Sequence, residues 1–208
     1  MTTPTFLEPQ FNATDVELVA EETLYQGFFS MRRLDYRHRQ YQGGWSKLIQ
    51  REVLFRGDAV GAVLYDPSHD LIGLVEQIRP GAIGAQPSPW CLEVVAGMVE
   101  EGESNEDVVW RELKEEADIV PRKVEYICEY MASPGGCDER LHVFCALADL
   151  QGLDGGVHGL DTEGEDIRLM VLPAAEVFEN LYGGRFNNAA TMIGLQWLQM
   201  NRARLRAE

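Results

Sequence analysis

Residues 97–119 read GMVEEGESNEDVVWRELKEEADI. Ser104 followed three residues later by Asp107 is typical of a helix N-terminus, and Pro121 ends the helical pattern just beyond this stretch. At about 100° per residue, one arc of the pattern collects the apolar side chains. These side chains are Val109, Trp110, Leu113 and Ala117. The stretch therefore predicts a helix over residues 105–117 that buries this arc.

Three glutamates, Glu112, Glu115 and Glu116, lie on a second arc of the predicted helix, clear of the apolar one. Arg111 stands four residues before Glu115 and can form an ion pair with it. Carboxylates one turn apart repel one another, so a positive charge is expected to offset them. Because Mg²⁺ and Mn²⁺ prefer carboxylate oxygens, the cluster indicates a metal site. Taken alone, the three glutamates also fit a solvated acidic helix face.

The spacing of the whole stretch resembles the Nudix box of the nucleoside diphosphate-X hydrolases. Its fixed places are occupied here by Gly97, Glu103, Arg111, Glu112, Leu113, Glu115, Glu116 and Ile119. One place differs, because Asp118 stands where the family has a glycine. That glycine ends the helix in a left-handed conformation, which aspartate tolerates better than most residues. The difference therefore concerns stability more than catalysis.

The rest of the chain alternates short strand-like runs with two further helical patterns. Its 208 residues, 45% hydrophobic and 25% charged, suffice for one full core and a small appended domain. Strands are predicted within 16–26, 28–40, 47–55, 59–65, 71–77, 90–96, 123–131, 141–147 and 167–172, and helices within 174–181 and 188–207. This order predicts an α/β (α+β) protein with a mixed sheet covered by helices. The resemblance implies the Nudix fold, a mixed β-sheet sandwiched between helices, over 58–208, with a small N-terminal antiparallel β domain over 1–57.

Basic residues concentrate near the N-terminus of an otherwise acidic chain. Seven of the eighteen are Arg32, Arg33, Arg37, Arg39, Lys47, Arg51 and Arg56. Aromatic residues such as Tyr36 and Trp45 are interleaved with them. Such a patch favours a small anionic ligand that carries a ring, or an acidic partner surface. A solvated hairpin with alternating faces is the simpler interpretation.

The stretch 151–166 is glycine-rich and acidic and has no periodicity. Loops longer than about 12 to 15 residues in compact domains are usually functional or disordered. The carboxylates of residues 161–166 and those of residues 100–116 form two separate acidic clusters, which indicates a shared cation.

The resemblance to bacterial ADP-ribose pyrophosphatases covers nearly the whole chain. It is carried by VAGM at 95–98, ASPGG at 132–136, the loop from His158 to Arg168, and NNAA at 187–190. It implies a homodimer that exchanges its N-terminal domain and uses Mg²⁺, with Mn²⁺ as a substitute, to split ADP-ribose into AMP and ribose 5-phosphate. A hydrolase of another nucleoside diphosphate sugar is the nearest alternative, since the box indicates only the diphosphate chemistry. A second alternative is a non-catalytic nucleotide-binding regulator. The intact glutamates argue against this alternative.

Carried over residue by residue, the resemblance implies a role for each site residue. The metal ligands are Glu112, Glu116, Glu165 and the backbone carbonyl of Ala96. Glu163 is the general base that activates the attacking water. The catalytic residues Arg111 and Glu115 orient the ligands, together with Glu103, and Gly97 is a structural place in the motif. Phosphoryl transfer mainly needs charge neutralisation and a positioned water, which such a set supplies.

The same resemblance implies substrate contacts on both predicted domains. Phe28 and Arg51, the latter from the other subunit, sandwich the adenine, and Arg79 holds the diphosphate. The further substrate contacts are Met98, Ser133 and Glu139, the last two to the ribose or the partner chain.

Composition argues against several other partners. Thirty-four acidic against eighteen basic residues give a net charge of −16, which repels nucleic acid and anionic lipid. No apolar window approaches the ~18 residues of a membrane span, and no leader pattern opens the chain. The four cysteines lack CxxC spacing and are expected to be reduced thiols. We therefore expect a soluble, cytoplasmic protein without nucleic acid or membrane partners.

Overall fold

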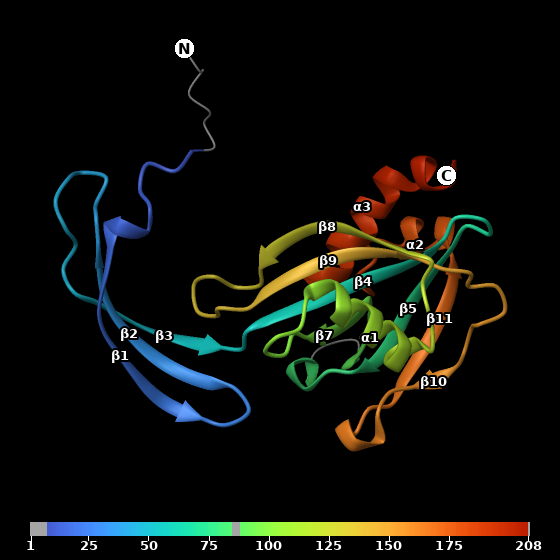
Figure 1. The fold of residues 1–208 in the computed structure, drawn as a ribbon, viewed down its shortest axis with the longest axis horizontal. Coiled ribbons are helices and arrows are strands. Elements are labelled where there is room, and N and C mark those ends of the chain that lie inside the picture. The colour runs from blue at the N-terminus through green and yellow to red at the C-terminus, as the bar shows by residue number, and fades with distance from the viewer. Residues whose placement is uncertain (1–7, 85–87, 208) are drawn as a thin grey trace, which may run out of the picture. The chain divides into compact units, whose positions relative to one another are not determined.

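The structure, a computed structural model, describes residues 8–84 and 88–207 and divides into two compact units (Figure 1). The first comprises the chain up to Arg56 and the segment Ser133–Glu139. The second comprises Gly57–Ala132 and the chain from Arg140 onward. The sequence predicts a single domain boundary between residues 57 and 58. It did not predict that Ser133–Glu139 belongs to the first unit. Residues 1–7 and 208, the outer ends of the two predicted domains, lie outside the described residues.

The first unit is an antiparallel sheet in the order β1-β2-β3. After the short helix η1 come its three strands, so the elements are η1 (Ala13–Asp15), β1 (Val16–Gln26), β2 (Ser30–His38) and β3 (Ile49–Phe55). Gly43 and Gly44, with φ of 90° and 79°, lie between β2 and β3, in a left-handed conformation that glycine adopts without strain. Among residues 8–56 and 133–139, only Ser30 and Ser46 are buried. Taken by itself, this unit therefore has no apolar core within the described residues.

The second unit is built on a mixed sheet that follows the path β10-β11-β5-β4-β9-β8, with β6 added to β5 and β7 to β4. Only β4 and β9 are parallel, and the other pairs are antiparallel. The strands are β4 (Asp58–Asp66), β5 (Leu71–Ile78), β6 (Trp90–Glu93), β7 (Val95–Met98), β8 (Lys123–Met131), β9 (Arg140–Leu147), β10 (Val157–His158) and β11 (Ile167–Pro173). Two short helices accompany them, η2 (Pro80–Ala82) and η3 (Asp161–Glu163).

Three helices cover the two faces of this sheet: α1 (Asn105–Ala117), α2 (Ala174–Glu179) and α3 (Ala189–Leu205). Alternate residues of β4 point to opposite sides. Leu64 joins the apolar cluster that contains α1, whereas Tyr65 joins the cluster that contains α2 and α3. The predicted mixed sheet between helices is therefore confirmed. None of the helices in the described parts of the chain is long and apolar enough to cross a membrane.

Two segments differ from the sequence prediction. Residues 90–96, expected as one strand, form β6 and β7, which pair with different neighbours. The break falls at Val94, whose backbone N–H donates to the buried hydroxyl of Thr191 at 3.1 Å instead of to a strand. The stretch 151–166 contains β10, which pairs antiparallel with β11, and the short helix η3.

Candidate active site

Helix α1 carries the three box glutamates, and hydrogen bonds fix both of its ends. The N–H of Asp107 donates to the Ser104 hydroxyl at 3.2 Å. At the other end, the N–H of Asp118 donates to the carbonyl of Lys114, and the Asp118 side chain pairs with the Lys114 ammonium. Asp118 has a φ of 54°, the left-handed conformation expected at the place where the box has a glycine. The predicted helix and its unusual end are confirmed.

Two of the three glutamates are buried, and the prediction that they lie clear of the buried face is wrong. Glu112 is 8% exposed and Glu116 is 2% exposed, whereas Trp110 is only partly buried. The reason is tertiary, because β7 lies against this side of α1. Glu112 packs onto Gly97 of β7, and Glu116 accepts a backbone N–H from the same strand. The pair therefore meets a strand backbone rather than water.

Gly97 is required by the packing of Glu112. A Cβ atom at Gly97 would lie 1.7 Å from Oε1 and 2.0 Å from Cδ of Glu112. Because both atoms belong to the carboxylate, any side chain at residue 97 would displace that carboxylate. The glycine of the box is thus explained by close approach.

Two neighbours hold the carboxylate of Glu116. The N–H of Ala96 donates to Oε2 at 3.1 Å, and the side-chain amide of Gln77 donates to Oε1 at 3.3 Å. Burial raises the pKa of Glu116 to about 8, although the Ala96 N–H lowers it and Glu112 raises it further. Burial likewise raises the pKa of Glu112 to about 7, against the opposing effect of Arg111. Both carboxylates are therefore placed where an added positive charge would stabilise them.

Arg111 links the glutamates to one another. Its Nη1 lies 2.8 Å from Oε1 of Glu112 and 3.2 Å from Oε2 of Glu115. Its Nε donates to Oε1 of Glu103 at 3.2 Å, and its Nη2 reaches the carbonyl of Met98 at 3.4 Å. One guanidinium thus orients three carboxylates and the end of β7, which agrees with the orienting role implied by the resemblance.

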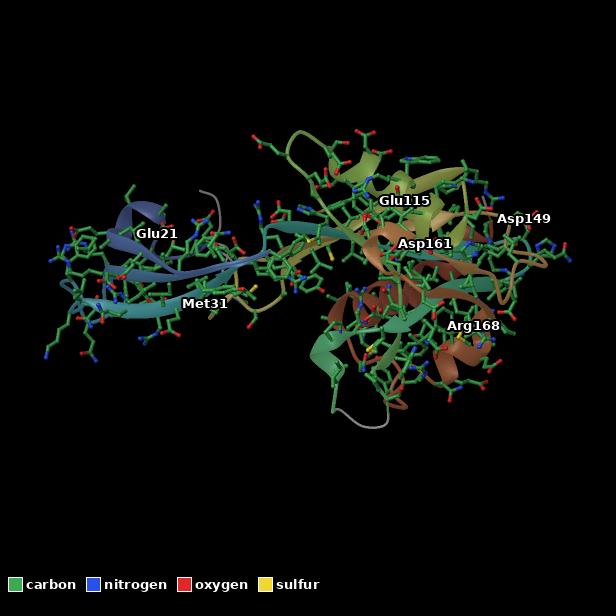
Figure 2. The ribbon with its side chains drawn as sticks, turned by 90° about the horizontal axis from the view of Figure 1, so that it is seen from below. Glu21, Met31, Glu115, Asp149, Asp161 and Arg168 are labelled. Carbon is green, nitrogen blue, oxygen red and sulfur yellow. The ribbon has the colours of Figure 1, made fainter. Side chains whose placement is uncertain are left out.

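The acidic loop after β10 is hydrogen-bonded to α1. Figure 2 labels one residue of each segment, Asp161 in the loop and Glu115 on the helix. The N–H of Gly159 donates to the carbonyl of Glu115 at 3.1 Å. The charge of Glu165 raises the pKa of both Glu112 and Glu116, so this carboxylate belongs to the cluster. Glu163 lies in η3 and is exposed, and its side chain forms no hydrogen bond or ion pair with the described residues. The structure brings Glu165 to the glutamate pair, whereas Glu163 forms no hydrogen bond with either glutamate.

Arg79 lies at the edge of the same cluster, where its charge lowers the pKa of Glu116. Its Nε donates to Oε2 of Glu93 at 2.7 Å, and the amide of Asn188 donates to Oε1 of Glu93 at 2.9 Å. The resemblance implied no site role for Gln77, Glu93 or Asn188, although Asn188 belongs to the matching stretch 187–190. The one available signal was a glutamate inside the apolar run 90–96.

The other predicted substrate residues, Phe28, Arg51, Ser133 and Glu139, belong to the first unit. Phe28 is 86% exposed and stacks edge-on against Phe29. The Arg51 guanidinium donates to the carbonyl of Gln50 at 2.7 Å, and Glu139 pairs with Arg56 at 3.2 Å. The Ser133 carbonyl accepts two backbone N–H groups of its own turn.

Much of the basic patch forms ion pairs with β1 of the same sheet. Arg32, Arg33 and Arg37 each pair with a glutamate of that strand, at 2.7 to 2.9 Å. The simpler interpretation, a solvated hairpin, therefore applies to these three. Arg51 differs, since it forms no ion pair with any carboxylate in residues 8–84 and 88–207.

A second group of possible metal ligands lies in the turn after β4. Oxygen and nitrogen atoms of Asp66, His69 and Asp149 come within 4.8 Å of one another. The Asp66 carboxylate already accepts N–H groups from Ser68, His69 and Leu150 and contacts the His69 ring. It therefore holds this turn together and is separate from the α1 cluster.

Comparisons with known proteins agree with this geometry. The NUDIX domain family matches residues 55–191. The ADP-ribose pyrophosphatase of Haemophilus influenzae is 41% identical over 198 residues, which cover 94% of this chain and 91% of that protein. The ADP-ribose pyrophosphatase of Escherichia coli strain K12 is also 41% identical, over 208 residues that cover 100% and 99%. A crystal structure of an ADP compounds hydrolase has the same fold, with a TM-score of 0.67 at 19% identity and coverage of 90% and 96%. From the buried glutamate pair, the box and these matches, we conclude that the chain belongs to the NUDIX domain family.

Proposed function

We propose that this protein hydrolyses the diphosphate of ADP-ribose and releases AMP and ribose 5-phosphate. One observation carries the proposal: the buried Glu112 and Glu116 pair contacts Gly97 and Ala96 of β7 in a chain that aligns end to end with two ADP-ribose pyrophosphatases. The glutamate pair supports diphosphate hydrolysis as the reaction, and the end-to-end alignment supports ADP-ribose as the substrate.

The substrate is tested with a panel of ADP-ribose, ADP-glucose and GDP-mannose at equal concentration. We expect kcat/KM to be highest for ADP-ribose. A higher kcat/KM for ADP-glucose or GDP-mannose would make that sugar nucleotide the substrate in place of ADP-ribose. Binding of all three without turnover would favour the non-catalytic regulator.

Mg²⁺ fits the α1 cluster, with Mn²⁺ as a substitute. Glu112 and Glu116 are buried carboxylates whose raised pKa values would fall beside a cation, and hard divalent ions prefer such oxygens. They would hold the ion together with Glu165 and the carbonyl of Ala96. When bound, the ion supplies charge neutralisation at the diphosphate and a more acidic water. The Asp66 group is a poorer fit, because each oxygen of its carboxylate already has two hydrogen-bonding neighbours, whereas each oxygen of Glu116 accepts only one hydrogen bond.

The chain's own residues would orient these ligands and complete the chemistry. Arg111 fixes Glu112 and Glu115, while Gln77 and the Ala96 N–H fix both oxygens of Glu116. Such neighbours keep a site within the narrow geometry that metal binding requires. We assign proton abstraction from the attacking water to Glu163, on the loop that Gly159 joins to α1. A pure binding protein would have no use for that base.

Replacing Gly97 by alanine should weaken Mg²⁺ binding by about 10- to 100-fold, the usual effect of disturbing the groups that orient metal ligands. The added Cβ would displace the Glu112 carboxylate from its place on β7. Isothermal titration with Mg²⁺ measures the change. Gly81→Ala is the matched control, because the Cβ that it adds has no atom of a described residue within 4 Å apart from its chain neighbours. Equal affinities in the two variants would contradict the role given to Gly97.

The first unit would dimerise with a second copy of the chain. Strand β1 exposes apolar side chains, including Leu18 at 56% and Tyr25 at 66%, and Phe28 between β1 and β2 is 86% exposed. A three-stranded sheet without an apolar core needs further burial to be stable. We expect sedimentation equilibrium at micromolar concentration to give twice the mass of one chain. A monomer with full activity would contradict both the dimer and the shared site.

The proposed substrate contacts divide between the units. Arg79 and Met98 would meet the diphosphate end, while Phe28, with Arg51 of the second copy, would enclose the adenine. The contacts proposed for the ribose or the partner chain are Ser133 and Glu139.

Arg51→Ala should raise the KM for ADP-ribose by about tenfold or more, with a smaller change in kcat, since one charged or stacking contact is worth about that much. Arg51 has no carboxylate partner in the described residues, so its loss should not disturb the sheet. Arg37→Ala is the matched control on the same sheet, where the arginine pairs with Glu17. If the two variants changed KM equally, Arg51 would not contact the substrate.

We also infer a cytoplasmic location. All four cysteines are free, and burial raises the pKa of Cys145 to about 12, which makes that thiol unreactive. Unpaired thiols of this kind are usual in reducing compartments.

A further inference from the structure

Arg79 is bonded through one of its three side-chain nitrogens. Its Nε donates to Oε2 of Glu93 at 2.7 Å. The two Nη atoms form no hydrogen bond or ion pair with residues 8–84 and 88–207, and the side chain is 41% exposed. A guanidinium presents its N–H groups in a planar fork that fits phosphate oxygens. The bond at Nε therefore sets the direction in which the two Nη atoms can meet an anion.

The alternation of strand side chains places Arg79 on the face of the sheet that carries the α1 glutamates. Arg79 follows β5 in an extended conformation, with φ of −117° and ψ of 117°, so it shares a face with Val75 and Gln77. Val75 belongs to the apolar cluster that contains α1, and Gln77 donates to Glu116. Glu93 of β6 lies directly opposite Val75 and shares the same face. The charge of Arg79 accordingly lowers the pKa of Glu116.

The start of helix α3 holds the other oxygen of Glu93. Glu93 is 7% exposed, and its Oε1 accepts the side-chain amide of Asn188 at 2.9 Å. Asn188 is the N-cap of α3, where its Oδ1 accepts the N–H of Thr191 at 2.9 Å. The cap fixes the amide, with its oxygen toward the helix and its nitrogen toward Glu93. A contact at each oxygen therefore fixes the Glu93 carboxylate, and that carboxylate fixes Arg79.

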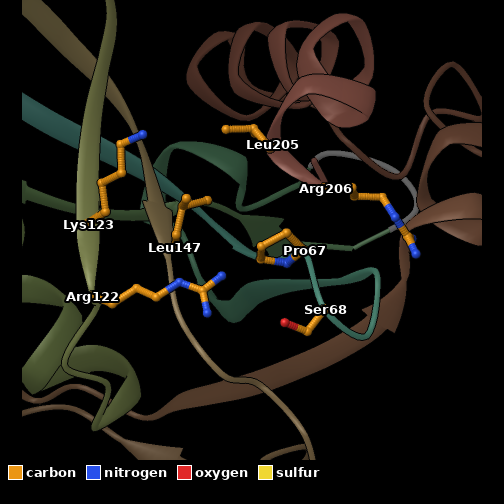
Figure 3. A pocket seen from close by; sticks show the side chains of 7 residues that line it. All are labelled: Pro67, Ser68, Arg122, Lys123, Leu147, Leu205 and Arg206. Atoms are coloured by element: carbon orange, nitrogen blue, oxygen red, sulfur yellow. The ribbon is translucent and has the colours of Figure 1, made fainter. Parts of the chain in front are cut away.

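Other cations of the second unit line a separate pocket. Arg122, Lys123 and Arg206 line a pocket of about 490 Å³, which Figure 3 shows from close by. None of the α1 glutamates lines that pocket, nor does Arg79. That pocket therefore does not supply the cation that a diphosphate would meet beside the α1 glutamates.

We propose that Glu93 and Asn188 are positioning residues, which hold the Arg79 guanidinium so that its two Nη atoms face the diphosphate. This role rests on the proposed function, in which Arg79 contacts the diphosphate. Neither residue touches the substrate, and both act through Arg79. An arginine that is oriented in advance loses less rotamer freedom on binding, so its contact with the diphosphate is stronger.

The test exchanges donor and acceptor between residues 93 and 188. In Glu93→Gln, the amide has one acceptor oxygen for the two donors of Arg79 and Asn188. In Asn188→Asp, the helix cap is kept, because aspartate caps as well as asparagine, but a second carboxylate faces Glu93. In the double variant, the new glutamine can accept from Arg79 and donate to the new aspartate, which restores both contacts.

ADP carries the diphosphate and is titrated by calorimetry in the presence of Mg²⁺. We expect each single variant to bind ADP about tenfold more weakly than the wild type, the usual effect of losing one charge-assisted hydrogen bond. The KM for ADP-ribose should rise similarly, with a smaller change in kcat, and the double variant should return close to the wild type. Glu76→Gln is the matched control, because its carboxylate pairs with Arg185 on the other face of β5, and it should not change ADP affinity.

Replacement of Arg79 separates positioning from a general effect on the fold. In an Arg79→Gln background, Glu93→Gln should have no further effect on ADP affinity, because the side chain through which Glu93 acts is gone. An equal loss of affinity in both backgrounds, or a double variant no better than the single ones, would overturn the inference. So would a wild type that does not bind ADP, since Arg79 would then hold no diphosphate.

Failure of the proposed function would give a different result, namely a wild type that binds ADP but does not hydrolyse ADP-ribose. The ADP titrations would then still decide whether Glu93 and Asn188 act through Arg79.

Discussion

The Glu163→Gln variant should have a kcat about 10² to 10⁴ lower than the wild type, with little change in Mg²⁺ or ADP-ribose binding. Glutamine keeps the size and hydrogen bonding of the side chain but cannot accept the proton of the attacking water. Glu163 is exposed on η3, and its side chain forms no hydrogen bond or ion pair with the described residues. The substitution should therefore leave the fold unchanged. Steady-state kinetics at saturating Mg²⁺ measures the effect.

The position of Glu163 agrees with a base that approaches the metal ligands only when substrate is bound. In the metal-free protein, another carboxylate beside Glu112 and Glu116 would add to their repulsion. Asp161→Asn is the matched control, because it removes a charge from the same short helix without removing the proposed base. If Glu163→Gln retains more than about a tenth of the wild-type kcat, another residue is the base. Glu165 and Glu115 are then the next candidates.

The Glu116→Gln variant should fail at an earlier step, because it should bind Mg²⁺ at least about a hundredfold more weakly. Both oxygens of Glu116 are held by neighbours, at 3.1 and 3.3 Å, so the side chain is positioned for a ligand role. Mg²⁺ at 100 times its Kd should stabilise the wild type by about 2.7 kcal/mol, since it binds only the folded state. The same concentration should leave the Tm of Glu116→Gln nearly unchanged.

Two comparisons make this result specific. Glu106→Gln removes an exposed carboxylate from the first turn of α1 and should keep the full Mg²⁺ effect on Tm. Glu163→Gln should also keep it, because its defect lies in proton transfer. A normal Mg²⁺ effect in Glu116→Gln would remove this residue from the ligand set.

Local signals in the sequence were sufficient to predict α1 and its ends. Ser104 and Asp118 act within one turn of the helix, so their roles can be read from neighbouring residues. The same is true of β1, whose predicted and observed limits are both 16–26. The family and the box glutamates also follow from fixed spacing in one stretch.

Long-range contacts explain what the sequence did not predict. Glu112 and Glu116 are buried because β7 covers them, and no periodicity in α1 indicates that strand. The break between β6 and β7 depends on the Thr191 hydroxyl, 97 residues away from Val94. Gln77 bonds to Glu116 from 39 residues away, and nothing in its own segment marks it as a site residue. Each of these depends on which segments the fold brings together.

Product analysis of ADP-ribose incubated with the wild-type chain and Mg²⁺ tests the central claim most directly. The wild type should release AMP and ribose 5-phosphate in equal amounts, and the double variant Glu112→Gln with Glu116→Gln should release neither. Unchanged ADP-ribose in the wild-type reaction, or equal product from the double variant, would contradict the claim that this glutamate pair serves ADP-ribose hydrolysis.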